Sequence, residues 1–149
     1  MKEQITSTMK VIALILLASW VSGCKKKDDP KPIDPQEQIK KTWTLGTSGY
    51  VIKDGIDVTT EYPGLTVTIN ADGTYTTTQA KKLFFPSGTW SWVGTGTIQF
   101  LLDGDIPVSV TELTQTNLAI QFNLNREHVN PNGRVEAVVG EYKLLLITQ

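Results

Sequence analysis

Alternation of apolar and polar side chains, with a period of two residues, constrains the fold of this chain more than any other feature. It is clearest in Leu65-Thr66-Val67-Thr68-Ile69, and it resumes at 74–78 after the turn Asn70-Ala71-Asp72-Gly73. Successive side chains of a β-strand point to opposite faces, so this period predicts strands with one buried and one solvated face. An Asp-Gly pair between two such segments also predicts a hairpin. Threonine fills many of the polar positions, which suits the solvent face of a strand.

The same pattern returns along the chain at intervals of about ten residues. Only 35–41 looks helical, as a turn or two before the first strand. Sequential hairpins that join about eight to ten short strands favour an antiparallel meander, either a closed barrel or a sandwich. Closure removes the exposed strand edges that a free sheet must otherwise protect. The predicted strands span 43–53, 65–69, 74–78, 89–93, 97–102, 106–113, 118–124, 134–138 and 141–148.

The N-terminal segment, residues 1–23, does not follow this pattern. A cationic stretch, 2–10, precedes an apolar run that starts at Val11, and the small residues Ser22 and Gly23 come after it. The apolar run is roughly a dozen residues long, whereas a membrane-spanning helix needs about 20. This order predicts a secretory signal peptide, which is removed and takes no part in the fold. A short core helix followed by an incidental cysteine is the alternative.

The exit of this segment, Val21-Ser22-Gly23-Cys24, resembles the lipobox of bacterial lipoproteins. The resemblance implies that Cys24 receives a diacylglyceryl group, that a peptidase cuts before it, and that the new N-terminus is acylated. Each buried methylene contributes on the order of 0.8 kcal/mol, so two or more acyl chains anchor a protein stably. Because Cys24 is the only cysteine in the sequence, it cannot form an internal disulfide. The expected partner is therefore a membrane, reached through the lipidated Cys24.

Residues 24–35 are expected to form the lipid anchor and a flexible tether. The eleven residues from 25 to 35 hold three prolines and seven charged residues, which leaves little apolar surface to bury. The cluster Lys27-Asp28-Asp29 resembles the short lysine–acid signal that directs lipoproteins of the Bacteroidota to the outer face of the outer membrane. That resemblance implies an outer-membrane protein that faces the cell surface. A plain spacer at the periplasmic face is the alternative.

The remainder, 36–149, is one domain by its length. It holds eight Lys/Arg and eleven Asp/Glu residues and no basic stripe, so nucleic acid is not an expected partner. The order of its motifs resembles the lipocalin-like lipoproteins of the Bacteroidota. The resemblance implies an antiparallel, up-and-down lipocalin-like β-barrel, and we expect a monomer. The motifs are the short helix, Trp43 on the first strand, the hairpin 70–75, Gly88-Thr89-Trp90, the strand at Leu118 and the closing strand at Tyr142.

Aromatic side chains are the candidate ligand-binding residues. At inward positions of a small barrel, they either fill the interior or line a chamber for one ligand. The segment 81–88 joins two strands yet contains Leu83, Phe84 and Phe85 in succession. These side chains either plug one end of the barrel or form an exposed contact tip. The candidates are Trp43, Tyr75, Phe84, Phe85, Trp90, Trp92 and Tyr142, with core packing as the alternative for each.

Catalytic and metal-binding motifs are not predicted. His128 is the single histidine and lies in a polar stretch, so with Cys24 acylated no Cys/His zinc site can be assembled. The serines that could pair with it have no nucleophile context. The remaining carboxylates suit turns better than calcium binding, and their spacing gives no support for a glycosidase pair. These candidates are Ser87, Ser91 and Ser109, the acids Asp54, Asp57, Asp103 and Asp105, and the pair Glu61 and Glu112.

Binding rather than catalysis is therefore the expected function, without a cofactor. We expect a non-enzymatic lipoprotein of the cell envelope whose barrel binds a small apolar or glycan ligand, or a partner protein. A structural or adhesive surface module with a filled barrel and no ligand is the alternative. An aromatic-lined cavity open at one end would favour the first function, and a filled interior would favour the second. Buried carboxylates that converge in such a cavity would favour an enzyme.

Overall fold

The computed structural model describes residues 34–80, 83–94, 98–125, 128–129 and 135–148. From Asp34 on, these residues belong to one compact unit. The predicted signal peptide, Cys24 and the tether up to residue 33 lie outside the described residues. So do the predicted turn at 130–133 and the side chain of His128.

Helix α2 (Pro35–Gln38) precedes the strands, as the sequence predicts, but it is shorter than 35–41. Asp34 caps its N-terminus, because its side chain accepts a hydrogen bond of 2.9 Å from the N–H of Gln36. Pro35 occupies the first helical position, where no N–H donor is needed. The helix ends at its C-cap residue, Ile39, whose side chain is fully buried.

The strands alternate in burial as the period of two predicts. In β4 and β8, for example, every second side chain is buried over most of the strand. A short 3-10 helix, η1 (Thr59–Glu61), lies between β3 and β4. The strands are β1 (Thr42–Thr44), β2 (Tyr50–Lys53), β3 (Ile56–Asp57), β4 (Thr66–Ile69), β5 (Thr74–Thr78), β6 (Ser87–Trp92), β7 (Gln99–Leu102), β8 (Ile106–Leu113), β9 (Asn117–Leu124), β10 (His128–Val129), β11 (Val135–Ala137) and β12 (Gly140–Thr148).

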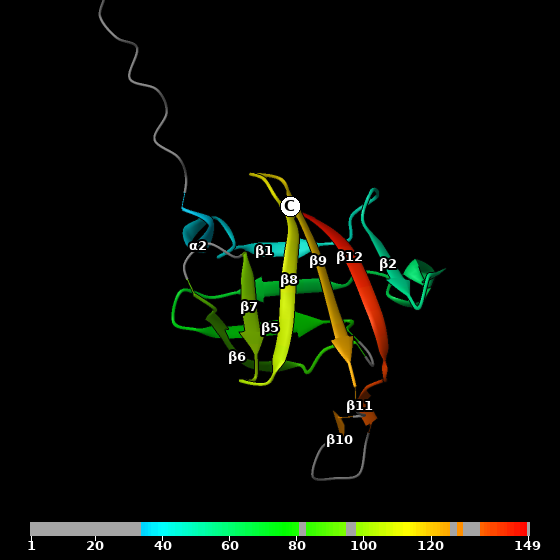
Figure 1. The fold of residues 1–149 in the computed structure, drawn as a ribbon. Helices are drawn as coiled ribbons and strands as arrows, with labels where there is room; N and C mark the ends of the chain where they lie inside the picture. Colours follow the sequence, from blue (N-terminus) through cyan, green and yellow to red (C-terminus); the bar gives the residue numbers. More distant parts are fainter. Residues whose placement is uncertain (1–33, 81–82, 95–97, 126–127, 130–134, 149) are drawn as a thin grey trace, which may run out of the picture. The chain divides into compact units, whose positions relative to one another are not determined.

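Eight of the strands form a closed antiparallel barrel in the order β1-β4-β5-β6-β7-β8-β9-β12. The barrel closes where β12 pairs with β1, with Thr148 opposite Trp43 and Ile147 opposite Thr44. Strands β2 and β3 extend the sheet from β12, and β10 and β11 form a separate hairpin. In Figure 1, β1 and β5 run behind β8 at a steep angle to it. The structure is therefore a barrel and not an open sandwich.

The first strand is interrupted, which corrects the prediction of one strand over 43–53. If the register between β1 and β12 continued, Leu145 on β12 would pair with Gly46. It pairs with Tyr50 instead, so four residues between β1 and β2 are left out of the strand pairing. Gly46 has a φ of +52°, in the left-handed region. At Gly49 a β-carbon would collide with the carbonyl oxygens of Leu45 and Leu145. The two glycines permit this sharp bend.

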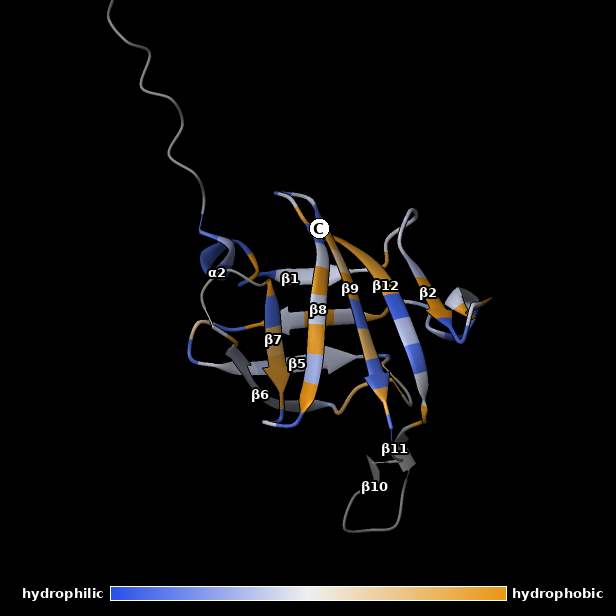
Figure 2. Cartoon of the chain, in the orientation of Figure 1, coloured by the Kyte–Doolittle hydropathy of each residue, from blue (hydrophilic) through white to orange (hydrophobic). Residues whose placement is uncertain are grey.

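The barrel interior is a continuous apolar core. Inward side chains from all eight barrel strands join it, together with Ile39 before β1 and Leu83 and Phe84 after β5. Figure 2 shows the resulting alternation most clearly along β8, where orange bands alternate with pale ones. Among the described residues, the buried ones include no charged or amide side chain. The side chains that line the interior are therefore aliphatic and aromatic.

Candidate functional site

Six of the seven predicted aromatic residues fall into three groups in or beside the barrel core, and the seventh, Tyr75, is bound to Asp103. The first is a row across the core. The Phe84 ring lies 5.2 Å from that of Phe122, and Phe122 stacks on Tyr142 with 5.3 Å between centroids. Phe84 and Tyr142 are buried, whereas Phe85 is only half-buried at the edge of this row. In the connection between β5 and β6, the Phe84 ring thus lies in the core and the Phe85 ring lies near the surface.

The second group surrounds Phe100 on β7. Trp90 meets it edge-on at 6.3 Å between centroids, and Trp92 stacks on it at 6.4 Å. Both tryptophans come from β6, two residues apart, so they share the inward face as the sequence predicts. Trp90 is buried, and Trp92 is half-buried at the edge of the core. The indole N–H of Trp90 donates to the carbonyl of Asn70 at 2.9 Å.

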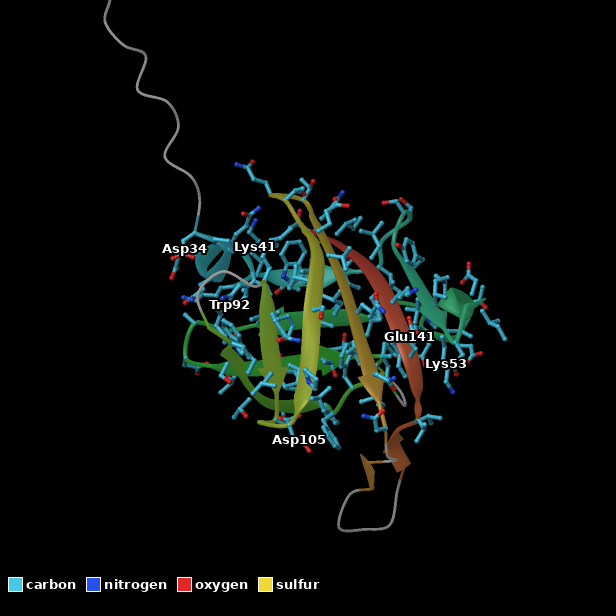
Figure 3. The ribbon with its side chains drawn as sticks, viewed as in Figure 1. Asp34, Lys41, Lys53, Trp92, Asp105 and Glu141 are labelled. Atoms are coloured by element: carbon cyan, nitrogen blue, oxygen red, sulfur yellow. The ribbon has the colours of Figure 1, made fainter. Side chains whose placement is uncertain are left out.

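The third group seals the barrel end beside α2. Trp43 is fully buried, and its indole N–H donates to the carbonyl of Ile39 at 2.8 Å. The Nζ of Lys41 lies 5.5 Å from the centre of the Trp43 ring and donates to the carbonyl of Gln115 at 2.9 Å. Figure 3 shows Lys41 beside α2. Lys41 thus places a cation against the ring of the first-strand tryptophan.

The opposite end is filled from the connection between β5 and β6. Ala80, Leu83 and Phe84 are buried there, with Leu83 and Phe84 only 1% and 6% exposed. The connection is fastened to β5 by Thr77, whose N–H donates to the carbonyl of Pro86 at 2.8 Å and whose hydroxyl donates to that of Phe85 at 2.8 Å. Of the two roles predicted for these residues, plug or exposed tip, Leu83 and Phe84 occupy the plug position.

Two small apolar voids lie against Phe84, each of about 10 Å³. Such a space holds at most about one water molecule, whereas ligand pockets span about 300–1,000 Å³. Tyr75, Phe84 and Leu102 line both voids. The end void is completed by Leu83, Phe85, Ile106, Phe122 and Leu124, and the central void by Val67, Ile69, Phe100, Leu118, Ile120 and Leu146.

The hydroxyl of Tyr75 is bound within the protein. It donates to Oδ2 of Asp103 at 2.7 Å, while Oδ1 of Asp103 accepts the N–H of Thr89 at 2.9 Å. Burial raises the pKa of Tyr75 well above its usual range, and the hydrogen bond and charge of Asp103 add to this rise. Gly88 makes the arrangement possible, because a β-carbon there would overlap the Asp103 carboxylate and the Tyr75 ring. The Tyr75 hydroxyl therefore ties β5 to the turn after β7.

The hydroxyl of Tyr142 is also hydrogen-bonded within the protein, on β12 where β2 extends the sheet. Its hydroxyl donates to the carbonyl of Val138 at 2.9 Å. Burial raises the pKa of Tyr142 to about 12, with smaller contributions from Tyr62, Asp54 and Glu61. The polar atoms of Trp43, Tyr75, Trp90 and Tyr142 are thus all engaged by the protein itself. A sugar in the interior would find none of these four groups free.

The outer surface divides into two chemically different faces. On β12, Glu141 and Lys143 point outward and pair at 3.2 Å, and Figure 3 shows Glu141 on this strand. Lys53 of β2 lies instead on the same face of the sheet as Tyr142, its cross-strand partner, with its Nζ 5.9 Å from the centre of that ring. On β1, β4, β5 and β6, by contrast, all ten outward positions carry a hydroxyl and none carries a charge. Two cross-strand pairs are hydrogen-bonded, Thr42 with Thr68 and Thr66 with Thr78. The ten residues are Thr42, Thr44, Thr66, Thr68, Thr74, Thr76, Thr78, Ser87, Thr89 and Ser91.

Three of the four acidic residues weighed as calcium ligands, Asp54, Asp57 and Asp103, accept hydrogen bonds from backbone N–H groups. Oδ1 of Asp54 accepts the N–H of Glu141 at 2.8 Å, and Oδ1 of Asp57 accepts that of Thr59 at 2.9 Å. Hydrogen bonds from Thr59 lower the pKa of Asp57. Glu61 and Glu112, weighed as a glycosidase pair, are both exposed. Within the described part of the chain, no three His, Cys, Asp or Glu side chains gather in a way that could hold a metal ion.

Phe100 and Phe122 are central to this interior, and Asp103 binds Tyr75 at its edge, yet the sequence analysis selected none of the three as ligand-binding residues. Phe100 and Phe122 sit at inward positions of predicted strands, and each stacks on a residue that was selected. The alternation of β7 and β9 was the signal that could have identified them. Asp103 carries no comparable signal, since Asp-Gly is ordinary turn chemistry.

No helix among the described residues is both long and apolar enough to cross a membrane. Comparisons of the chain with protein-family models, with curated proteins and with solved structures give no match.

Proposed function

We propose that this chain is a lipid-anchored protein of the bacterial cell envelope. In this proposal the signal peptide 1–23 directs export, Cys24 carries the lipid, and the tether 24–35 holds the barrel at the outer membrane, facing the cell surface. The support is the order of the N-terminal segments together with the resemblance to lipocalin-like lipoproteins. The closed eight-stranded barrel is compatible with that resemblance.

We further propose that the barrel acts through its outer surface, as a monomeric, non-enzymatic module that contacts a partner protein or serves a structural or adhesive role. The observation that supports this is the filled interior. Trp43 and Ile39 close one end, Leu83 and Phe84 fill the other, and the voids beside Phe84 are of about 10 Å³. A carrier would be expected to keep an open chamber for its ligand. An interior glycan ligand is disfavoured further, because the core offers only apolar contacts.

The test is to isolate the wild-type protein from membranes and to compare it with a Cys24→Ser variant. Mass spectrometry of the N-terminal peptide should find Cys24 diacylated, and the variant should appear in the soluble fraction after export. Solvent extraction of the wild-type protein, after removal of the covalent lipid peptide, should release no small molecule at a one-to-one ratio.

Two results would contradict the two parts of the proposal separately. Membrane retention of Cys24→Ser equal to that of the wild type would refute the anchor. An apolar compound found in the extract at a one-to-one ratio to the protein would refute the proposal that the barrel acts only through its outer surface.

A further inference from the structure

We infer that the barrel end beside α2 lies against the lipid bilayer, with Trp92, Ile98 and Leu113 at the boundary between headgroups and acyl chains. These three residues are named the rim. The inference rests on the lipid anchor proposed above, and it adds which part of the barrel contacts the membrane.

The rim forms where inward apolar side chains of three neighbouring strands, β6, β7 and β8, continue past the core. On β6, Trp90 is buried, whereas Trp92 is half-buried. Ile98 precedes β7, two residues before the buried Phe100, and is 44% exposed. Leu113, the last residue of β8, is half-buried against the core. Exposure of the apolar side chains thus increases toward one end of the barrel.

The rim lies at the end where the chain enters the barrel. Lys41 directly precedes β1, and its Nζ donates to the carbonyl of Gln115 at 2.9 Å, two residues beyond Leu113. Figure 3 shows Asp34, Lys41 and Trp92 at this same end. The segment that leads to Cys24 therefore continues from the end of the barrel that carries the rim.

The length of that segment indicates that a lipid bilayer is what covers the rim. Asp34 follows Cys24 by ten residues, and an extended chain advances at most about 3.6 Å per residue. The anchor therefore keeps this end of the barrel within about 36 Å of the bilayer. A short flexible linker gives an effective concentration in the millimolar range, so that a weak contact becomes populated. Three side chains bury too little area to hold an unanchored barrel on lipid.

The side chains at this end suit the headgroup region. Tryptophan is enriched there because its ring is apolar and its N–H is polar. Trp43 and Trp90 donate their indole N–H groups within the barrel, whereas Trp92 makes no such bond with the described residues. The ammonium of Lys41 contacts a carbonyl and the Trp43 ring, neither of which neutralises its charge. It thus provides a cation for lipid phosphates beside the rim.

The connections at the two barrel ends differ in charge. At the rim end, the segments 93–98 and 114–116 contain no charged residue, whereas at the opposite end 79–86 contains two lysines and 103–105 two aspartates. Taking a charge out of water costs free energy unless it is paired, so the rim end approaches lipid at the lower cost. Helix α2 carries Asp34 and the ion pair Glu37–Lys40, which confines the contact to the β6, β7 and β8 side of this end.

The test uses the lipidated protein, purified from membranes and reconstituted into phosphatidylcholine vesicles whose acyl chains carry bromine near the headgroup. Bromine quenches tryptophan fluorescence at short range. Removal of residues 1–23 takes Trp20 and leaves three of the four tryptophans. Relative to vesicles without bromine, the emission should fall by the share of Trp92, and Trp92→Phe should abolish this loss. Ile98→Asp should diminish it without a change in thermal stability, because the side chain is already 44% exposed.

Two matched variants place the same kinds of change away from the rim. Ile56→Asp alters a side chain of β3 that is 67% exposed, and quenching should stay at the wild-type level. Val139→Trp, in the Trp92→Phe background, replaces a side chain that is 45% exposed and lies just before β12. Strand β12 starts at the opposite end of the barrel, where Gly140 pairs with Leu124. Bromine should leave the emission of this variant unchanged.

Flotation of the same vesicles in a density gradient separates this inference from the anchor. A wild-type protein that does not float refutes the anchor, and the inference falls with it. Flotation without loss of emission overturns the inference alone, and equal quenching of the Val139→Trp variant overturns the choice of barrel end. A dimer of the Cys24→Ser chain that Ile98→Asp dissociates would assign the rim to a second copy of the chain and would also overturn the inference.

Discussion

The bond between Tyr75 and Asp103 is the feature whose contribution to stability can be worked out most directly. The Tyr75 side chain is 2% exposed, and its hydroxyl donates to a half-buried carboxylate at 2.7 Å. Hydrogen bonds to charged groups contribute about 1.5–3 kcal/mol. Because water can still reach part of Asp103, we expect the lower half of that range. Tyr75→Phe should therefore lower the free energy of unfolding by about 1.5–2 kcal/mol.

The partner substitution has to preserve the turn in which Asp103 sits. Asp103 has a φ of +51°, a conformation that costs most residues about 1–2 kcal/mol but that asparagine tolerates. Asp103→Asn is thus preferable to Asp103→Ala. Asparagine has one side-chain oxygen, which can accept from either the Tyr75 hydroxyl or the Thr89 N–H. Its amide nitrogen then occupies the position of the second oxygen, where it cannot accept the other hydrogen bond. We expect Asp103→Asn alone to cost about 1–2 kcal/mol.

A double-mutant cycle measured by urea denaturation, with tryptophan fluorescence as the signal, isolates the pair. The coupling energy between Tyr75→Phe and Asp103→Asn should be about 1 kcal/mol or more. Tyr50→Phe is the matched control, because Tyr50 is 39% exposed, and its substitution should change stability by less than about 0.5 kcal/mol. The reasoning is refuted if Tyr75→Phe lowers the free energy of unfolding by no more than Tyr50→Phe does, because that loss does not depend on which group the Asp103→Asn side chain accepts from.

Two further predictions follow from the same interior. Gly88→Ala should destabilise the fold by about 1–3 kcal/mol in urea, because its methyl group would overlap the Asp103 carboxylate and the Tyr75 ring; wild-type stability would contradict this close approach. Stability should also fall as the pH rises from about 10 to 12. In that window the unfolded chain releases the Tyr142 proton and the folded chain, in which the pKa is about 12, retains it. The loss is about 1.4 kcal/mol per pH unit for each such tyrosine. Thermal melts of Tyr142→Phe should show a shallower alkaline slope than the wild type, and an equal slope would exclude Tyr142 as a contributor.

The strands could be predicted from sequence because their burial is periodic. Strand β8 has the predicted bounds, 106–113, and β5 has the bounds 74–78. The interruption of the first strand was missed because alternation continues on both sides of it, at Trp43 and again at Val51. The sequence marks the interruption only by the glycines Gly46 and Gly49. The alternation of apolar and polar residues does not show that four residues leave the strand pairing between them.

Whether the barrel is filled could not be predicted from the strands at all. Alternation assigns Tyr75, Trp90 and Tyr142 to the interior, but a row of inward aromatics is compatible with either a core or a chamber. The decision depends on residues outside the strands: Ile39 after a helix of one turn, and Phe84 in a connection. Their packing is set by where the chain enters and leaves the barrel ends, which is tertiary information. Ile39 closes its end by accepting the indole N–H of Trp43, which belongs to the β1 ladder, whereas Phe84 closes the other end from a connection that Thr77 ties to β5. Each closure thus joins a residue outside the strands to one within them, and a period of two within the strands cannot specify such a pair.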